Sequence, residues 1–165
     1  MLPVKILLTK IFIKNEKRHL EAVRELIPVN AQSSILSKVK TELNRLETLY
    51  EGVYLLNELS NKTRHVVAGF GEVLSSLIIA EYFKNLGVNS QYIDSRELIV
   101  CKNTNEKVQV NYAQTNANIE NYFETKDASL YIAPGFVSRN EQGVPSTLGR
   151  GGSDFTAALY GAALD

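Results

Sequence analysis

The spacing of apolar residues changes near Gly87, and this change divides the chain into a helical part and an alternating part. Between Leu36 and Val53 the apolar residues recur three or four positions apart, which predicts a long amphipathic helix. A shorter apolar stripe that Pro28 ends predicts a preceding helix. The two helices should pack as a helical hairpin within residues 1–62.

Local capping signals suggest where the helices begin and end. The pair Ser33 and Ser34 is expected to cap the long helix, because a hydroxyl can accept from the free amides of the first turn. A further apolar stripe predicts a helix over 72–86, with Gly87 as its left-handed C-terminal cap.

Beyond that helix, short segments have the composition of strands, and one more helix separates the last two. The strands are expected at 88–93, 97–101, 108–112 and 128–133, and the helix at 116–123. Strands that alternate with helices favour an α/β fold, which we expect to be a three-layer αβα sheet. The α/β part should occupy residues 63–165.

Composition excludes several classes of function. The chain has 18 basic and 18 acidic residues, so it lacks the positive field that holds a nucleic-acid backbone, and no nucleic-acid partner is expected. The single Cys101 cannot form an internal disulfide and, with only His19 and His65, gives no metal-site spacing, so we expect no metal and a cytoplasmic location. No strongly apolar stretch reaches the roughly 20 residues that span a bilayer, and the start of the chain lacks a signal-peptide cleavage site, so no membrane association is expected.

The sharpest motif is the glycine-rich segment Thr147-Leu-Gly-Arg-Gly-Gly-Ser-Asp154, which runs directly into an apolar helix. Glycines expose backbone amides, and the N-terminus of a helix starting at Ser153 or Asp154 favours negative charge, so the segment could hold an anion that Arg150 clamps. The alternative is a tight turn with two N-cap residues and a solvated arginine.

Two weaker features accompany this turn. Glu72 follows two glycines at the expected start of an apolar helix, where its carboxylate could receive a substrate ammonium group or simply cap the helix. The segment from Ala133 to Phe136 ends a predicted strand, the place where open α/β sheets bind ligands, although an ordinary exit from the strand fits equally.

In their order and intervals these features resemble the aspartate kinase family of the amino-acid-kinase superfamily. The resemblance covers essentially the whole chain. It is carried by the following blocks: Leu49-Tyr-Glu-Gly-Val, Gly69-Phe-Gly-Glu-Val-Leu-Ser-Ser76, Asp94-Ser-Arg-Glu-Leu98, Pro134-Gly-Phe-Val137 and Ser146-Thr-Leu-Gly-Arg-Gly-Gly-Ser-Asp154. The helical insert is most similar to the kinase part of bifunctional aspartate kinase and homoserine dehydrogenase enzymes. The resemblance implies an amino-acid-kinase fold and phosphorylation of the side-chain carboxylate of L-aspartate by Mg-ATP, in the pathway to lysine, threonine and methionine.

The resemblance also implies roles for individual residues. Arg150 would grip a carboxylate of aspartate, Glu72 would receive its ammonium group, and Asp154 would orient groups near the transferred phosphoryl. The remaining substrate-binding residues would be Ser153, the amides of Gly151 and Gly152, and the wall residues Phe136 and Thr147. Phosphoryl transfer needs positioning and charge neutralisation, which these groups could supply.

The sequence departs from the family at both ends. The family's opening Lys-Phe-Gly-Gly-Thr motif is absent, since Lys5 has no glycines after it, and the nucleotide-binding and regulatory segments expected after Asp165 do not follow. We therefore expect an inactive fragment that associates with itself. Two alternatives stay open: a non-catalytic module that binds small anions through Arg150, and a helical interaction module that uses the seam from Leu36 to Val53.

Overall fold

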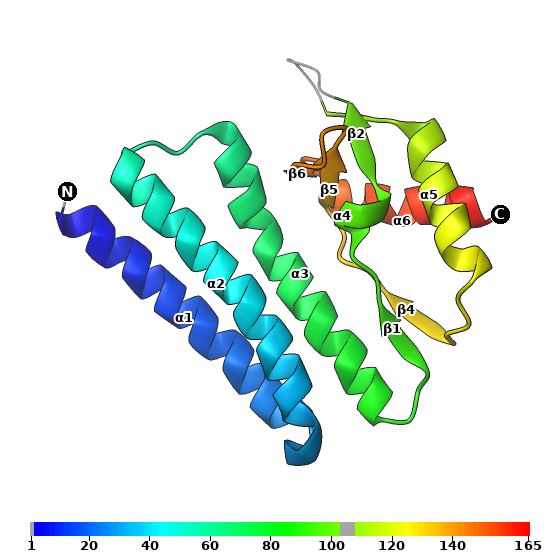
Figure 1. Cartoon of the computed structure of the whole chain (residues 1–165), viewed down its shortest axis with the longest axis horizontal. Helices are drawn as coiled ribbons and strands as arrows, with labels where there is room; N and C mark the ends of the chain where they lie inside the picture. Colours follow the sequence, from blue (N-terminus) through cyan, green and yellow to red (C-terminus); the bar gives the residue numbers. More distant parts are fainter. Residues whose placement is uncertain (1, 103–107) are drawn as a thin grey trace.

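The computed structural model describes residues 2–102 and 108–165. Three long helices, α1 (Leu2–Leu26), α2 (Gln32–Leu56) and α3 (Asn61–Asn85), lie side by side with alternating directions, and a one-turn helix η1 (Val29–Ala31) joins the first two (Figure 1). Their buried faces form one core. In α2 that face consists of Ile35, Val39, Leu43 and Leu46, so the amphipathic helix is confirmed.

Several helix boundaries differ from expectation. Ala31, not Ser33 or Ser34, occupies the N-cap of α2, and both serines lie within its first turn. The preceding helix α1 is far longer than its apolar stripe suggested, although it does end just before Pro28. Gly87 has a φ of 85°, and the amide of Val88 donates to the carbonyl of Phe83 at 3.1 Å, so the expected C-terminal cap of α3 is confirmed.

Helix α3 begins well before the expected residue 72. Ser60 caps it, because the Ser60 hydroxyl accepts a hydrogen bond from the amide of Thr63 at 3.1 Å. By length and composition α3 could also cross a membrane, but it packs against α2 on one side and against the strand Ser90–Tyr92 on the other. Those contacts are typical of the central helix of a folded core.

The strands form two short sheets. In the first, β1 (Ser90–Tyr92) pairs in parallel with β4 (Leu130–Ile132). The second has the order β3-β2-β5-β6, with β2 and β5 parallel and the outer pairs antiparallel. Its members are β3 (Gln109–Val110), β2 (Val100–Lys102), β5 (Val137–Asn140) and β6 (Pro145–Thr147).

Part of the strand expected at 97–101 is instead a one-turn helix, α4 (Ser95–Leu98). The Asp94 carboxylate accepts from the amide of Arg96 at 3.0 Å and so caps α4, and the strand begins only at Val100.

Two helices, α5 (Tyr112–Glu124) and α6 (Gly152–Leu164), lie on the side of the strands away from α3 (Figure 1). Ile93, Leu98 and Ile119 form a core there, with aromatic residues of α5, β4 and α6 around it. The layers are therefore helix, sheet and helix, which confirms the expected αβα arrangement.

Candidate functional site

The glycine-rich segment forms a turn of left-handed residues at the start of α6. Gly149 and Gly151 have φ values of 77° and 74°, and Gly151 is the N-cap of the helix. The amide of Gly152 donates to the carbonyl of Gly149 at 3.0 Å, so this amide closes the turn. Within residues 2–102 and 108–165, the amides of Ser153 and Asp154 have no partner, as is usual for the first turn of a helix.

The exit from β4 packs directly onto this turn. A Cβ atom added to Gly152 would lie 2.9 Å from Cδ2 of Phe136, and one added to Gly135 would lie 3.0 Å from Cα of Ser153. The amide of Phe136 donates to Oγ1 of Thr156 at 3.0 Å, and its carbonyl accepts from the amide of Leu148 at 2.8 Å. These contacts explain why two glycines are needed where the segments meet.

Phe136 has a φ of 70°, which is rare for a bulky side chain. Its two backbone hydrogen bonds and the contact with Gly152 hold it in this conformation. Backbone strain of this kind often occurs at ligand sites. No pattern in the sequence indicates that Phe136 adopts this conformation.

Glu72 does not lie in the first turn of its helix. It is exposed near the middle of α3, so the expected role as a helix cap is wrong. It nevertheless lines an open cavity of about 550 Å³ together with Gly135, Ser153 and Thr156. The structure therefore brings Glu72 to the start of α6, although the two are far apart in the sequence.

Apart from Ser153, the other expected site residues do not line this cavity. Arg150 is exposed in the turn that precedes Ser153, and Asp154 is exposed on the first turn of α6. Thr147 is only 1% exposed, and its hydroxyl has no partner among the described residues. Tyr160, on the cavity wall, has its pKa raised to about 12 by burial, although a hydrogen bond with Ser95 acts in the opposite direction.

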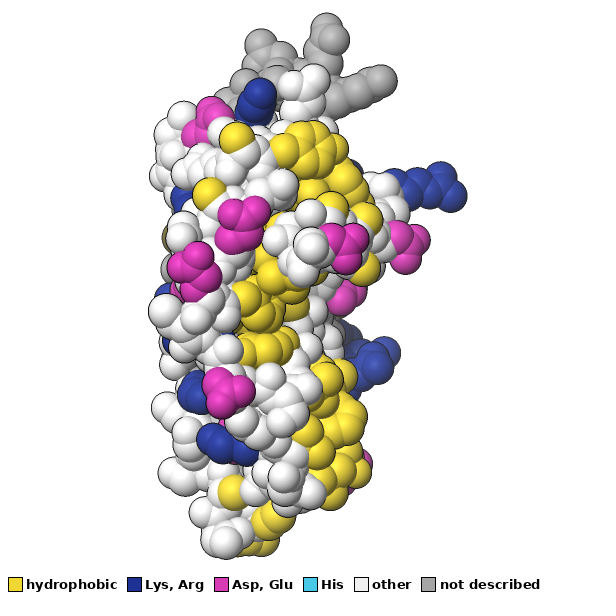
Figure 2. Space-filling model, turned by 90° about the vertical axis from the view of Figure 1, so that its right-hand side faces the viewer, with side chains coloured by type: hydrophobic (Ala, Val, Ile, Leu, Met, Phe, Trp, Pro, Cys, Tyr) yellow, Lys and Arg dark blue, Asp and Glu magenta, His cyan; other side chains and the backbone are white. Residues whose placement is uncertain are grey.

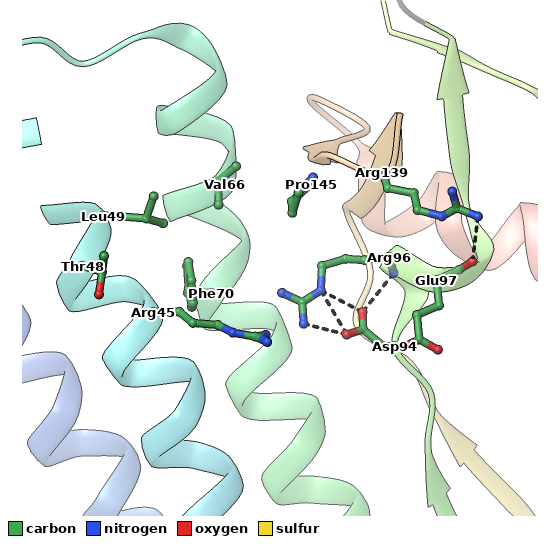
Figure 3. Close-up of a pocket in the computed structure, with 11 residues that line it drawn as sticks. Arg45, Thr48, Leu49, Val66, Phe70, Asp94, Arg96, Glu97, Arg139 and Pro145 are labelled. Atoms are coloured by element: carbon green, nitrogen blue, oxygen red, sulfur yellow. Dashed lines mark hydrogen bonds and ion pairs between the residues drawn. The ribbon is translucent and has the colours of Figure 1, made fainter. Parts of the chain in front are cut away.

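A second cavity, of about 820 Å³, lies between the helical layer and the sheet (Figure 3). Arg96 contacts Asp94 at 2.6 Å and Glu42 at 3.5 Å. Burial acts to lower the pKa of the Arg96 guanidinium, but the hydrogen bond and charge of Asp94, together with Glu42, outweigh it and raise that pKa. Arg45 points toward this cluster from α2, and Arg139 donates to the Glu97 carbonyl at 3.5 Å.

The sequence analysis assigned no functional role to the segment from Asp94 to Leu98 beyond its part in the resemblance. The available signal was Asp94 itself, because aspartate is a preferred N-cap residue. Arg45 and Arg96 are paired with carboxylates, and the contact of Arg96 with Glu42 joins α4 to α2. Among the residues that the structure describes, no group of three or more metal-ligating side chains is found.

The sequence profile of the amino acid kinase family matches residues 11–165. The chain belongs to the amino acid kinase family. Among curated amino acid kinases, it is 28% identical over 149 residues to the chloroplastic bifunctional aspartokinase/homoserine dehydrogenase 2 of Arabidopsis thaliana, covering 90% of this chain and 16% of that protein. It is 32% identical over 150 residues to the chloroplastic aspartokinase 1 of the same plant, covering 88% of this chain and 25% of that protein.

The fold agrees with solved structures of amino acid kinases. Aspartokinase III of E. coli, crystallised with aspartate and ADP, superimposes with a TM-score of 0.75 at 24% identity, over 86% of this chain and 31% of that one. The aspartate kinase of Clostridium acetobutylicum gives a TM-score of 0.57 at 20% identity, over 93% of this chain and 34% of that one. This chain thus spans about a third or less of each relative.

Proposed function

We propose that this chain forms the aspartate-binding part of an aspartate kinase, an enzyme that phosphorylates the side-chain carboxylate of L-aspartate with Mg-ATP. The observation that carries the proposal is the cavity shared by Glu72 of α3 and Ser153 of α6. It places a carboxylate opposite the N-terminus of a helix, an arrangement that suits a small zwitterion with a positive and a negative end. Relatives that are named aspartokinases support the choice of aspartate.

Within this cavity each end of aspartate has its own partner. Glu72 receives the ammonium group, while the Ser153 amide and hydroxyl and the guanidinium of Arg150 hold a carboxylate. Arg150 is exposed, and it lies three residues before Ser153, which lines the cavity. Its side chain turns inward when the substrate binds. The planar fork of arginine also fixes the orientation of the carboxylate.

The remaining residues shape the pocket and prepare it for transfer. Phe136, Gly151 and Gly152 set the path of the turn, and Thr147 buttresses it from the interior. Asp154 would orient the transferred phosphoryl and its counterions, and magnesium would supply charge neutralisation there. We also propose that the 165-residue chain by itself does not catalyse the transfer.

Calorimetric titration of the purified chain with L-aspartate tests the substrate assignment. Arg150→Ala should weaken binding by about 2 kcal/mol, roughly thirtyfold, and Arg150→Lys should restore only part of that loss. Arg64→Ala, which removes an exposed arginine of α3, is the matched control and should bind like the parent chain.

Succinate tests the role of Glu72, because it has both carboxylates of aspartate but no ammonium group. The parent chain should prefer aspartate over succinate, and Glu72→Gln should abolish that preference, whereas Glu120→Gln on the exposed face of α5 should keep it. Equal binding of both ligands by the parent chain would instead indicate a module that recognises small anions without reading the ammonium group.

A further inference from the structure

The cavity of about 820 Å³ between the helical layer and the β5–β6 hairpin shares no lining residue with the cavity assigned to aspartate. On the outer face that carries α5 and α6, apolar side chains form a band with charged side chains scattered beside it (Figure 2). The 820 Å³ cavity instead gathers apolar and charged side chains around one hollow (Figure 3). Its size and mixed lining are typical of small-molecule sites.

Part of the cavity lining is apolar. Leu49 of α2 and Val66 and Phe70 of α3 line the helical side, and Pro145 of β6 lies across from them (Figure 3). Leu49 and Val66 are half-buried and Pro145 is exposed, so these side chains keep apolar surface in contact with water. A ligand with an apolar body would remove that surface from water, which is favourable.

Four charged groups at the cavity form a balanced network. Asp94 accepts from Arg96 through both of its oxygens, at 2.6 to 3.1 Å. Glu42 accepts from Arg96 at 3.5 Å and from Arg45 at 2.7 Å. Two guanidinium groups thus neutralise two carboxylates, and the network has no charge of either sign left for a ligand.

Arg139 of β5 stands outside this network. Within residues 2–102 and 108–165 it makes no ion pair, and its guanidinium donates only to the carbonyl of Glu97, at 3.5 Å. A guanidinium has several N–H groups, so most of them remain free. The exposed Glu97 side chain points to the other side of α4 and does not pair with them (Figure 3). Arg139 therefore offers the cavity one unpaired positive charge.

The register of the hairpin places Arg139 beside the apolar lining. Arg139 pairs directly with Pro145 of β6, so the two side chains project from the same face of the hairpin. An anionic group on Arg139 would have Pro145 next to it and Val66 across the cavity. The planar guanidinium matches the geometry of a carboxylate, and one unpaired cation matches one negative charge.

We infer that this cavity binds an organic monocarboxylate with a compact apolar body. The carboxylate pairs with Arg139, and the body packs between Pro145 and the side chains of Val66 and Phe70. A second negative charge on the ligand would find no partner, because Arg45 and Arg96 are already neutralised. The inference goes beyond aspartate binding and concerns other residues, so either proposal can fail alone.

Saturation-transfer difference NMR of the complete 165-residue chain with 3-phenylpropanoate tests the ligand class. We expect a dissociation constant of about 1 mM or lower. Acetate, which lacks the ring, and 3-phenylpropanol, which lacks the charge, should each bind at least about tenfold more weakly. Phenyl phosphate, which carries a second negative charge, should bind less tightly than 3-phenylpropanoate. No saturable binding of 3-phenylpropanoate, or binding of any of the other three compounds that equals it, would overturn the inference.

Two arginine variants separate pairing with Arg139 from general attraction by positive charge. Arg139→Gln should weaken binding of 3-phenylpropanoate at least about tenfold, because the ion pair is lost. Arg45→Gln removes a cation of the same cavity that is already paired with Glu42, and it should change binding less than about threefold. Equal effects of the two variants would overturn the assignment of the carboxylate to Arg139.

Two tryptophan variants of α2 test whether the ligand occupies this cavity. Thr48→Trp introduces an indole at an exposed position of the cavity lining and should abolish binding of 3-phenylpropanoate. Ser37→Trp, at an exposed position of the same helix outside the cavity, should leave binding unchanged. Full binding by the Thr48→Trp variant would overturn the inference.

Discussion

Gly69 of α3 lies so close to Val137 of β5 that a Cβ atom added to the glycine would be 2.8 Å from Cγ1 of the valine. Gly71, two residues further along the same helix, has nothing within 4 Å of the corresponding position. The two glycines therefore form a matched pair, one required by packing and one not.

Alanine at each position should consequently act in opposite directions. Gly69→Ala should lower the free energy of unfolding by about 1 to 3 kcal/mol, because α3 and β5 must move apart. Gly71→Ala should raise it by about 0.5 to 1 kcal/mol through the higher helix propensity of alanine. Urea denaturation followed by circular dichroism measures both, and an unchanged Gly69→Ala variant would contradict the close contact.

The ion pair between Asp94 and Arg96 should stabilise α4 and hold Arg96 near Glu42 of α2. Both side chains are less than 20% exposed, so Asp94→Asn, which keeps an acceptor for the cap but removes the charge, should cost about 2 kcal/mol of unfolding free energy. Arg45→Ala, at the exposed end of the same cluster, should cost less than about 0.5 kcal/mol. Equal effects of the two variants in urea denaturation would show that burial of the pair is unimportant.

The raised pKa of Tyr160 predicts a loss of stability at alkaline pH. Since its hydroxyl titrates near 10 when unfolded and near 12 when folded, the stabilisation is complete below pH 10 and disappears as pH rises toward 12. Tyr160 alone should contribute about 2 to 3 kcal/mol to the fall in unfolding free energy over this interval. Tyr160→Phe should lose some stability at neutral pH with the Ser95 hydrogen bond, but should show a smaller alkaline decrease.

The purified chain should release no ADP from ATP in the presence of aspartate. Transfer needs the phosphates as well as the carboxylate to be held in place, and the sequence lacks the phosphate-contacting Lys-Phe-Gly-Gly motif of the family that it resembles. A coupled assay of ADP release measures this. Aspartate-dependent turnover that Asp154→Ala abolishes would refute the prediction, because a contaminating kinase would be unaffected by that substitution.

We also expect the chain to associate with itself. Ile6, Leu7, Ile11 and Ile13 on α1 are all between 41 and 58% exposed, and aliphatic surface of this extent is typical of an interface. Light scattering should give more than the mass of one chain, and the double variant Ile6→Lys, Ile13→Lys should reduce it to the monomer. Ala157→Trp should have no effect, since Ala157 is exposed on α6 and not on α1.

Sequence patterns predicted elements with one clearly buried stripe and failed where polarity was less regular. The spacing in α2 identified that helix, but α1 was underestimated because Ile6 and Ile13 are apolar and exposed, which obscures its stripe. The start of α3 was placed too late because Gly69 and Gly71 suggest a break in a helix, whereas Gly69 answers a tertiary contact with Val137. No local pattern reports such a contact.

The candidate site shows the same limit. The glycine-rich turn before α6 could be found because Gly149 and Gly151 adopt conformations that glycine favours. The position of Glu72 opposite that turn depends on how α3 crosses the sheet, and the left-handed Phe136 depends on its bonds to Leu148 and Thr156. Both are properties of the assembled layers.

Helix α3 packs against neighbours on both of its sides. Phe70, Leu74 and Ile78 pack with α1 and α2, while the same helix also contacts β1, β4 and β6. If the helical bundle melted, α3 would lose one of its buried sides and the sheet would lose the support of its covering helix. The chain should therefore unfold in a single cooperative transition, and amides in α3 and in β5 should exchange with solvent at the same, global rate.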